Sequence, residues 1–422
     1  MSKIDTLCVQ AGYEPKNGEP RVVPIVQSTT YAYDTASGLA DLFDLKADGY
    51  FYTRLANPTV GALEEKLATL DGGSCAIGCA SGMSATLLAV LNVCNAGDNI
   101  VSSRAIYGGT YNLFSITLKK YGIECRFFDP DDSEESIDAL VDEHTKVIFA
   151  ETLANPTIVV LDFEKIARIA SKHQVLFMVD NTLVTPALFR AKEWGANIVL
   201  YSSSKYLDGH AVALGGLIVD LGNFDFSATN RYEEFLVPDE SYHGLVYSTL
   251  GNKAFGVKCR VQMMRDMGAI MSPENAFLTN LGMETLALRM QRHSENTKKV
   301  AKFLSESDKV EWVKHPSLEN DKYHALAQKY LPDGMGGMMS FGVKGGSEKA
   351  AAFMEKLKMI KIVTHVADAR SCVLHPASTT HRQLSKADLE AIGIADNLIR
   401  LSVGIENAED IIFDLNQALN AI

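Results

Sequence analysis

Two titratable side chains stand directly after apolar runs that have the composition of buried strands. Lys205 follows the segment NIVLYSSS, and Asp180 ends the segment VLFMVD. A third apolar run, CAIGCA, leads into Ser81, Gly82 and Met83 and then into a segment with helical periodicity. Functional residues gather beyond the carboxyl ends of strands in a parallel sheet, so we expect these three sites to lie close together.

The three sites carry complementary chemistry. A lysine amine can form a Schiff base with an aldehyde, and a carboxylate can pair with a protonated pyridine nitrogen. Backbone N–H groups at a helix start, together with the hydroxyls of Ser202 and Ser204, can bind a phosphate. Tyr107, in the segment AIYGGTYN, can stack on an aromatic ring. Pyridoxal phosphate (PLP) combines an aldehyde, a pyridine ring and a phosphate, and the sequence predicts it as the cofactor.

The elements around these residues alternate between strand and helix, which predicts an α/β fold with a mostly parallel central sheet. The expected strands are 75–80, 99–103, 124–129, 146–151, 176–180, 197–202 and 215–220. The expected helices between and before them are 57–72, 83–94, 111–122 and 163–174.

Both ends of the chain differ from this pattern. The first fifty-odd residues are rich in Gly, Pro and Thr and lack sustained periodicity, which is typical of an arm. A long helical tract at 275–307 leads to a tail that resembles a smaller α+β domain, with expected strands at 336–345 and 398–404 and expected helices at 347–358 and 407–419. We therefore predict an N-terminal arm at 1–56, a cofactor-binding α/β domain at 57–280 and a C-terminal α+β domain at 281–422.

Composition narrows the class of partner. The 422 residues include 40 basic and 52 acidic ones, and this net charge of −12 argues against binding nucleic acid or an anionic membrane. The seven cysteines are scattered and show no zinc-ligand spacing, so we expect reduced thiols and no metal. No run of roughly eighteen apolar residues occurs and the start lacks an apolar signal core, so the expected compartment is cytoplasmic.

Seven motifs, in order along the chain, resemble one family. They are YTRLANPT, ASGMSA, YGGTY, ETLANPT, VDNT, SSSKYLDGH and IRLSVGIE. This order is similar to that of the Cys/Met-metabolism family of fold-type-I PLP-dependent enzymes, which includes cystathionine synthases and lyases, methionine γ-lyase and O-acetylhomoserine sulfhydrylase. The resemblance runs from about Thr6 to the C-terminus. It implies the fold-type-I transferase architecture with an N-terminal arm and a smaller C-terminal domain.

The resemblance also implies a role for individual residues. Lys205 matches the lysine that binds the cofactor covalently and acts as general base, Asp180 the partner of the pyridine nitrogen, and Tyr107 the ring-stacking residue that assists catalysis. The residues that match the phosphate-binding positions are Gly82, Met83, Ser202 and Ser204.

Other matched positions bind the substrate or come from a second subunit. Arg400 matches the arginine that holds the substrate carboxylate. Asn155 matches a position near the cofactor ring and that carboxylate, and Ser371 matches one that helps to hold the carboxylate. Tyr52 and Arg54 match a pair that the arm places in a neighbouring subunit's site. The resemblance thus implies a homotetramer built from dimers that share active sites.

Three features favour one subfamily, O-acetylhomoserine sulfhydrylase (O-acetylhomoserine aminocarboxypropyltransferase). Methionine γ-lyases carry a cysteine where this chain has Gly109, and the segment from Asp220 to Lys258 resembles an insertion of the sulfhydrylases. The segments RVQMMRDMGAIMSPENAFL and LHPASTTHRQLS are also close to that subfamily. The implied reaction is γ-replacement on O-acetyl-L-homoserine by sulfide or methanethiol, giving L-homocysteine or L-methionine and acetate.

Alternatives within the family stay open at the level of sequence. They are methionine γ-lyase and cystathionine γ-synthase or γ-lyase, and the choices between sulfide and methanethiol and between acetyl and succinyl esters are undecided. A non-catalytic binding protein on an α/β shell would lack the cofactor, and Lys205 together with Asp180 argues against it.

Overall fold

A computed structural model describes residues 2–380, 382 and 393–422. Within this part of the chain, the larger sheet has seven strands in the order β1-β7-β6-β5-β4-β2-β3. Their bounds are β1 Cys75–Cys79, β2 Asn99–Ser103, β3 Glu124–Phe128, β4 Thr145–Glu151, β5 Leu176–Asp180, β6 Ile198–Tyr201 and β7 Gly216–Asp220. Only β7 runs antiparallel to its neighbours, β1 and β6. The α/β fold with a mostly parallel sheet is confirmed, and each expected strand of this region is present.

The helices of this region follow from local signals in the sequence. Helix α3 begins after Asn57, whose side chain accepts hydrogen bonds from two backbone N–H groups, and ends at Gly72, which adopts a left-handed conformation with φ of 68°. Segment 111–122 was expected to be one helix, but it divides into the end of α5, a π-helical turn and a 3₁₀ turn. The other helices up to residue 267 are α4 Gly82–Leu91, α5 Gly108–Asn112, α6 Glu134–Asp138, α7 Phe163–His173, α8 Thr185–Leu188, α9 Glu233–Leu236, α10 Ala254–Lys258 and α11 Arg265–Met267, with α3 at Pro58–Asp71.

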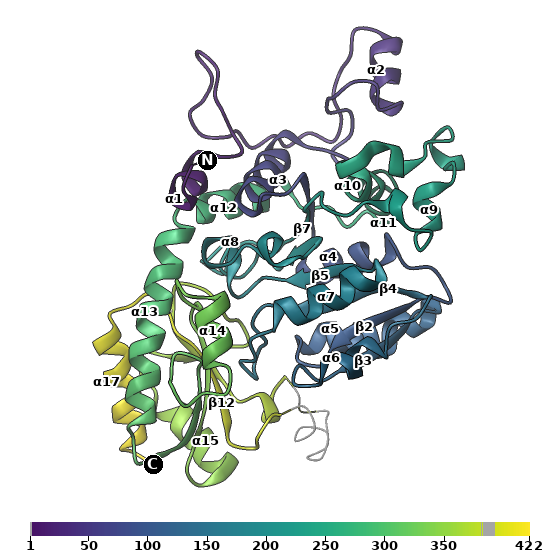
Figure 1. Ribbon diagram of the computed structural model, residues 1–422. Coiled ribbons are helices and arrows are strands. Elements are labelled where there is room, and N and C mark those ends of the chain that lie inside the picture. Colours follow the sequence, from purple (N-terminus) through teal and green to yellow (C-terminus); the bar gives the residue numbers. More distant parts are fainter. Residues whose placement is uncertain (1, 381, 383–392) are drawn as a thin grey trace.

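A smaller sheet forms in the C-terminal part, in the order β10-β11-β12-β9-β8. Its strands are β8 Val310–Lys314, β9 Met338–Val343, β10 Lys361–Ile362, β11 Cys372–Leu374 and β12 Leu398–Ser402, and the helices are α14 His324–Tyr330, α15 Gly346–Lys356 and α17 Ala408–Leu419. Strands β8, β10 and β11 and helix α14 were not expected from the sequence. Figure 1 shows α13 (Leu286–Ser305), α15 and α17 around this sheet.

The long helical tract is divided in two. Helix α12 spans Pro273–Glu284 and α13 spans Leu286–Ser305, and the break lies at Thr285, whose ψ of 11° departs from helical geometry. The predicted domain boundary at 280/281 falls within α12, and the three domain ranges stay predictions.

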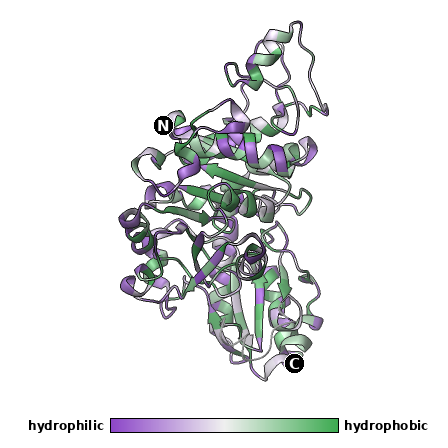
Figure 2. Cartoon of the chain, turned by 90° about the vertical axis from the view of Figure 1, so that its right-hand side faces the viewer, coloured by the Kyte–Doolittle hydropathy of each residue, from purple (hydrophilic) through white to green (hydrophobic). Residues whose placement is uncertain are grey.

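The large sheet is buried on both faces. One cluster of buried apolar residues includes Val179 and Val199, and a second includes Met178 and Leu200, so alternate residues of the same strands pack into different layers. Figure 2 shows hydrophobic residues concentrated in these strands. All seven cysteines are free and none is exposed. Among the described residues, no helix is long and apolar enough to cross a membrane.

The first 56 residues contain two described helices, α1 Ile4–Gln10 and α2 Ala36–Phe43, joined by irregular segments. Figure 1 shows α2 and the loops beside it projecting away from the body of the molecule. Several large hydrophobic side chains of this region are exposed, although such side chains are usually covered. They are Val9, Val22, Ile25, Tyr33, Phe43, Leu45, Tyr50 and Tyr52.

Candidate active site

A cavity of about 250 Å³ opens at the carboxyl ends of β4, β5 and β6 and at the start of α4. It brings together most of the residues that the sequence singled out. Those that line it are Gly82, Met83, Tyr107, Asn155, Asp180, Ser202, Ser204, Lys205 and Arg400. Ser81, Thr86, Thr110, Glu151, Leu153, Thr182, Leu183, Leu214, Thr364 and Val366 complete the lining.

One end of the cavity can donate hydrogen bonds from its N–H and O–H groups to an anion. Ser81 caps α4 through a reciprocal pair of hydrogen bonds with Ser84, so Gly82 and Met83 occupy the first turn, where backbone N–H groups have no partner within the helix. A Cβ atom at Gly82 would lie 2.7 Å from Cβ of Ser202, so only glycine allows this close approach of α4 to the end of β6. The Ser202 and Ser204 hydroxyl oxygens are 3.0 Å apart.

The cavity wall also holds two carboxyl groups from neighbouring strands. Asp180 ends β5 and pairs in register with Glu151 at the end of β4. Asp180 accepts a hydrogen bond from the Thr182 N–H at 2.9 Å, and Glu151 accepts one from the Tyr107 N–H at 2.6 Å. Burial raises the pKa of both groups, and the charge of Asp180 raises the pKa of Glu151 further. This pair favours a positively charged group beside Asp180.

Lys205 follows Ser204 in the turn that leaves β6. Burial, and then the charge of Arg400, lower the pKa of its amine. The Nζ atom lies 3.4 Å from Nδ1 of His365. An amine that loses its proton more easily than an exposed lysine is suited to nucleophilic and base chemistry.

Arg400 reaches the cavity from β12 of the smaller sheet. Its guanidinium donates hydrogen bonds to the backbone oxygens of Thr364 at 3.1 Å and His365 at 3.3 Å. Burial lowers the pKa of Arg400 to about 10. A buried arginine fixed by backbone carbonyls is suited to bind a carboxylate.

Three residues that the sequence singled out lie outside this cavity. The Ser371 hydroxyl donates to Glu406 at 2.9 Å and accepts from the Gly404 N–H at 2.8 Å. Glu406 thus accepts its hydrogen bond from Ser371, whereas the Arg400 guanidinium donates to the backbone oxygens of Thr364 and His365.

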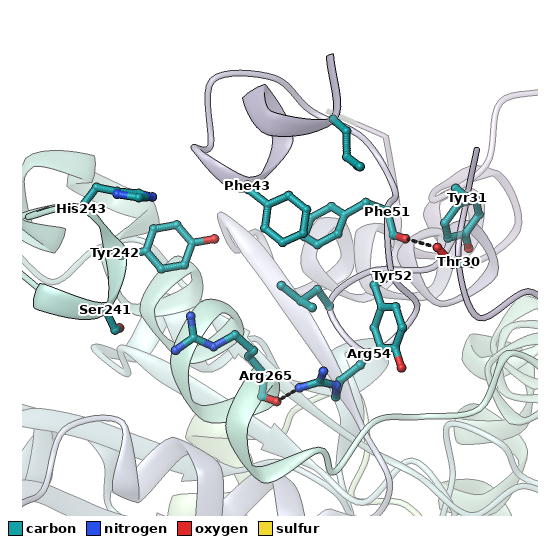
Figure 3. A pocket seen from close by; sticks show the side chains of 12 residues that line it. Thr30, Tyr31, Phe43, Phe51, Tyr52, Arg54, Ser241, Tyr242, His243 and Arg265 are labelled. Carbon is teal, nitrogen blue, oxygen red and sulfur yellow. Dashed lines mark hydrogen bonds between the residues drawn. The ribbon is translucent and has the colours of Figure 1, made fainter. Parts of the chain in front are cut away.

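Tyr52 and Arg54 line a separate pocket between the arm and the segment around Tyr242, which Figure 3 shows. The Arg54 guanidinium donates to the backbone oxygen of Arg265 and lies 5.2 Å from the centre of the Tyr52 ring. Within one chain, these two residues do not meet Lys205.

Glu151 and Thr182 were not among the predicted site residues, although both lie at or just beyond strand ends and belong to the motifs ETLANPT and VDNT. Nothing in the sequence indicated Thr364 or Val366, which lie on an irregular segment after β10. The subfamily motif LHPASTTHRQLS lies partly outside the described residues, at 381 and 383–385.

Comparison with known proteins decides the family. The family model described as "Cys/Met metabolism PLP-dependent enzyme" matches residues 5–420. The chain belongs to this family. The family depends on PLP, and the cofactor expected from the sequence is confirmed.

Relatives of this family member are similar over their whole length. It is 42% identical to an O-acetyl-L-homoserine sulfhydrylase of Leptospira meyeri, with 100% of this chain and 97% of the relative covered. It is also 42% identical to a homocysteine synthase of Schizosaccharomyces pombe, with 99% and 98% covered.

A solved structure has the same fold. The crystal structure of a putative O-acetylhomoserine (thiol)-lyase from Campylobacter jejuni matches with a TM-score of 0.96 and 40% identity, covering 99% of this chain and 100% of that one. That protein carries N'-pyridoxyl-lysine-5'-monophosphate at position 205. The fold-type-I architecture expected from the sequence is confirmed.

The cavity described above fits PLP. The Asn155 Oδ1 atom is buried and has no hydrogen-bond partner among the described residues, so a polar group is expected to fill the space before it. The cavity supplies an amine at Lys205, a buried carboxyl at Asp180 and the first turn of α4 for a phosphate.

Replacing Asp180 by Asn tests the assignment of the carboxyl group. Loss of a buried charge partner costs about 3–5 kcal/mol, so we expect turnover to fall by about 10²–10⁴-fold while covalent binding of the cofactor to Lys205 persists. Steady-state rates and the visible absorbance spectrum measure the two effects. Near-normal turnover of Asp180→Asn would rule out Asp180 as the partner of the pyridine nitrogen.

Proposed function

We propose that the chain catalyses γ-replacement on O-acetyl-L-homoserine, in which sulfide displaces acetate and L-homocysteine forms. The observation that carries this proposal is the cavity that unites Lys205, Asp180 and Arg400, in a chain whose relatives are named for this reaction and its product. Methanethiol is the alternative thiol and would give L-methionine.

In the proposed site, each end of the cofactor meets a matching group. Lys205 would bind the cofactor covalently, Asp180 would pair with the pyridine nitrogen, and Tyr107 would stack on the ring. Asn155 binds a polar group of the cofactor ring. The phosphate is bound by the Gly82 and Met83 N–H groups and by the Ser202 and Ser204 hydroxyls.

The side chains of this site then handle the substrate. Bound PLP supplies an electron sink that eases loss of protons from the substrate's Cα and Cβ and loss of its γ-substituent. Arg400 holds the substrate carboxylate, and Ser371 supports that wall through its contact with Glu406. Lys205, with its lowered pKa, takes and returns the protons. Acetate leaves as a stable anion, so Tyr107 needs to give it little assistance.

Gly109 favours γ-replacement over the elimination reaction that methionine γ-lyases catalyse. A Cβ atom at this position would lie 2.4 Å from Cε1 of Tyr107, so any side chain at 109 requires the tyrosine ring to move. The Tyr107 backbone N–H donates a hydrogen bond to Glu151. The position of the Tyr107 ring thus depends on a glycine at 109, where methionine γ-lyases carry cysteine.

A homotetramer of dimers with shared sites is part of the proposal. It is supported by the separation of Tyr52 and Arg54 from Lys205 within one chain and by the exposed hydrophobic side chains of the projecting arm. In the dimer, the arm of one subunit would complete the cofactor site of the other. The seven free cysteines support a reducing compartment, and we propose the cytoplasm.

An assay of products tests the proposed reaction. Purified holoenzyme is given O-acetyl-L-homoserine with sulfide, and we expect homocysteine and acetate in equal amounts, with little α-ketobutyrate. Lys205→Ala serves as the inactive control. Ammonia and α-ketobutyrate as the main products would identify a γ-lyase, and a preference for O-succinylhomoserine or cystathionine would contradict the acetyl-ester assignment.

Mixing two inactive variants tests the shared site. Arg54→Ala and Lys205→Ala subunits form hybrid dimers in which one of the two sites has both native groups, so activity should reappear after subunit exchange. Mass spectrometry of the mixture verifies that hybrids have formed. If Arg54 served its own subunit, every site in the hybrids would remain defective and no activity would return.

Replacing Arg400 by Lys tests carboxylate binding. The substitution keeps the charge but loses the planar pair of donors. We therefore expect a higher KM and a lower kcat/KM, equivalent to a loss of about 1.5–3 kcal/mol of transition-state binding free energy. Cofactor absorbance should not change. Kinetics with O-acetylhomoserine are compared with a thermal melt, and an unaltered KM with a depressed melting temperature would mean that Arg400 is only structural.

A further inference from the structure

His365 contacts the amine of Lys205 but has no part in the roles assigned so far. It lies on the segment between β10 and β11, 160 residues away along the chain, and its Nδ1 atom is 3.4 Å from Nζ of Lys205. Its side chain is 24% exposed. This distance permits one hydrogen bond between the two side chains.

The second ring nitrogen indicates which atom of His365 carries the proton. Nε2 lies 4.0 Å from an oxygen of Asp368 and has no hydrogen-bond partner among the described residues. A proton on Nε2 would point toward this carboxylate, which leaves the lone pair of Nδ1 facing Lys205. Burial, and then the charge of Lys205, lower the pKa of His365, so the ring is neutral at physiological pH.

The backbone of His365 serves a different group. Its carbonyl oxygen accepts a hydrogen bond from Arg400 at 3.3 Å, next to the bond from Arg400 to Thr364. One residue thus contacts the proposed carboxylate-binding arginine through its backbone and the lysine through its ring. A change of the His365 side chain leaves the carbonyl oxygen available to Arg400.

We propose that His365 is a positioning residue for Lys205, whose amine donates a hydrogen bond to Nδ1 of His365 whenever that amine is not bonded to the cofactor. The bond holds Nζ in one place while Lys205 takes and returns protons. This inference rests on the proposed function, in which Lys205 is the base. The charged or titratable groups around His365 are Lys205, Asp208, Asp368, Arg370, Cys372 and Arg400.

Three substitutions separate this role from simple packing. The side-chain amide of Asn reaches the position of Nδ1, whereas that of Gln reaches the position of Nε2, and Ala reaches neither. We expect His365→Asn to keep most of kcat and His365→Gln and His365→Ala to lose about ten- to a hundredfold, with KM for O-acetylhomoserine little changed because Arg400 keeps its contacts. The matched control is His173→Asn. His173 lies on α7 and, like His365, has a carboxylate beside it, that of Asp138.

A second measurement isolates the proton transfer from the γ-replacement. L-2-Aminobutyrate has no leaving group, and NMR in D₂O follows the exchange of its Cα proton on the holoenzyme. The rate should fall in His365→Gln and His365→Ala, and be kept in His365→Asn and the control. This readout works even if the thiol or ester assignment fails, so the two proposals are tested separately.

Two results would overturn the proposal. Native exchange rates in all three His365 variants would show that Lys205 does not need this contact. Equal losses in all three, with lowered melting temperatures, would show that the ring only fills space.

Discussion

The burial of two carboxyl groups side by side is the constraint on which the site depends. Asp180 and Glu151 end adjacent parallel strands, and their register places them together. A buried anion is costly without a partner, so a cation beside Asp180 would favour its ionised form. A protonated pyridine nitrogen meets this need. The pair therefore makes the cavity selective for a ring that can carry a positive charge.

Other parts of the fold supply the opposite charge and the close packing that the cavity requires. Lys205 follows a strand of the large sheet and Arg400 lies on a strand of the small one, and the charge of Arg400 lowers the pKa of Lys205. Gly82 lets α4 touch the end of β6, which brings helix N–H groups and serine hydroxyls to one place. The wall proposed to bind the substrate and the wall proposed to bind the cofactor thus belong to different sheets of one chain.

The site residues that could be predicted are those marked by adjacent residues in the sequence. Lys205 and Asp180 follow apolar strands directly, and the expected strand 176–180 has the observed bounds of β5. Glu151 belongs to the motif ETLANPT but was not predicted as a site residue. Its importance comes from the position of β4 next to β5, and periodicity does not reveal the order of strands in a sheet. His365 could not be found either, since only tertiary packing brings it to Lys205. The break between α12 and α13 at Thr285 was not predicted either, because helical periodicity continues across it.

The burial of the cysteines bears on how the protein tolerates the nucleophile it is proposed to use. Burial raises the pKa of every one of the seven thiols, to about 12 for Cys75 and Cys259 and to about 11 for Cys372. Thiolate is the form that exchanges with disulfides and reacts with electrophiles, and it is scarce at each of these positions. A low thiolate fraction makes these buried cysteines slow to form mixed disulfides. For the same reason, a cysteine introduced on the surface would be the site at which a maleimide dye attaches.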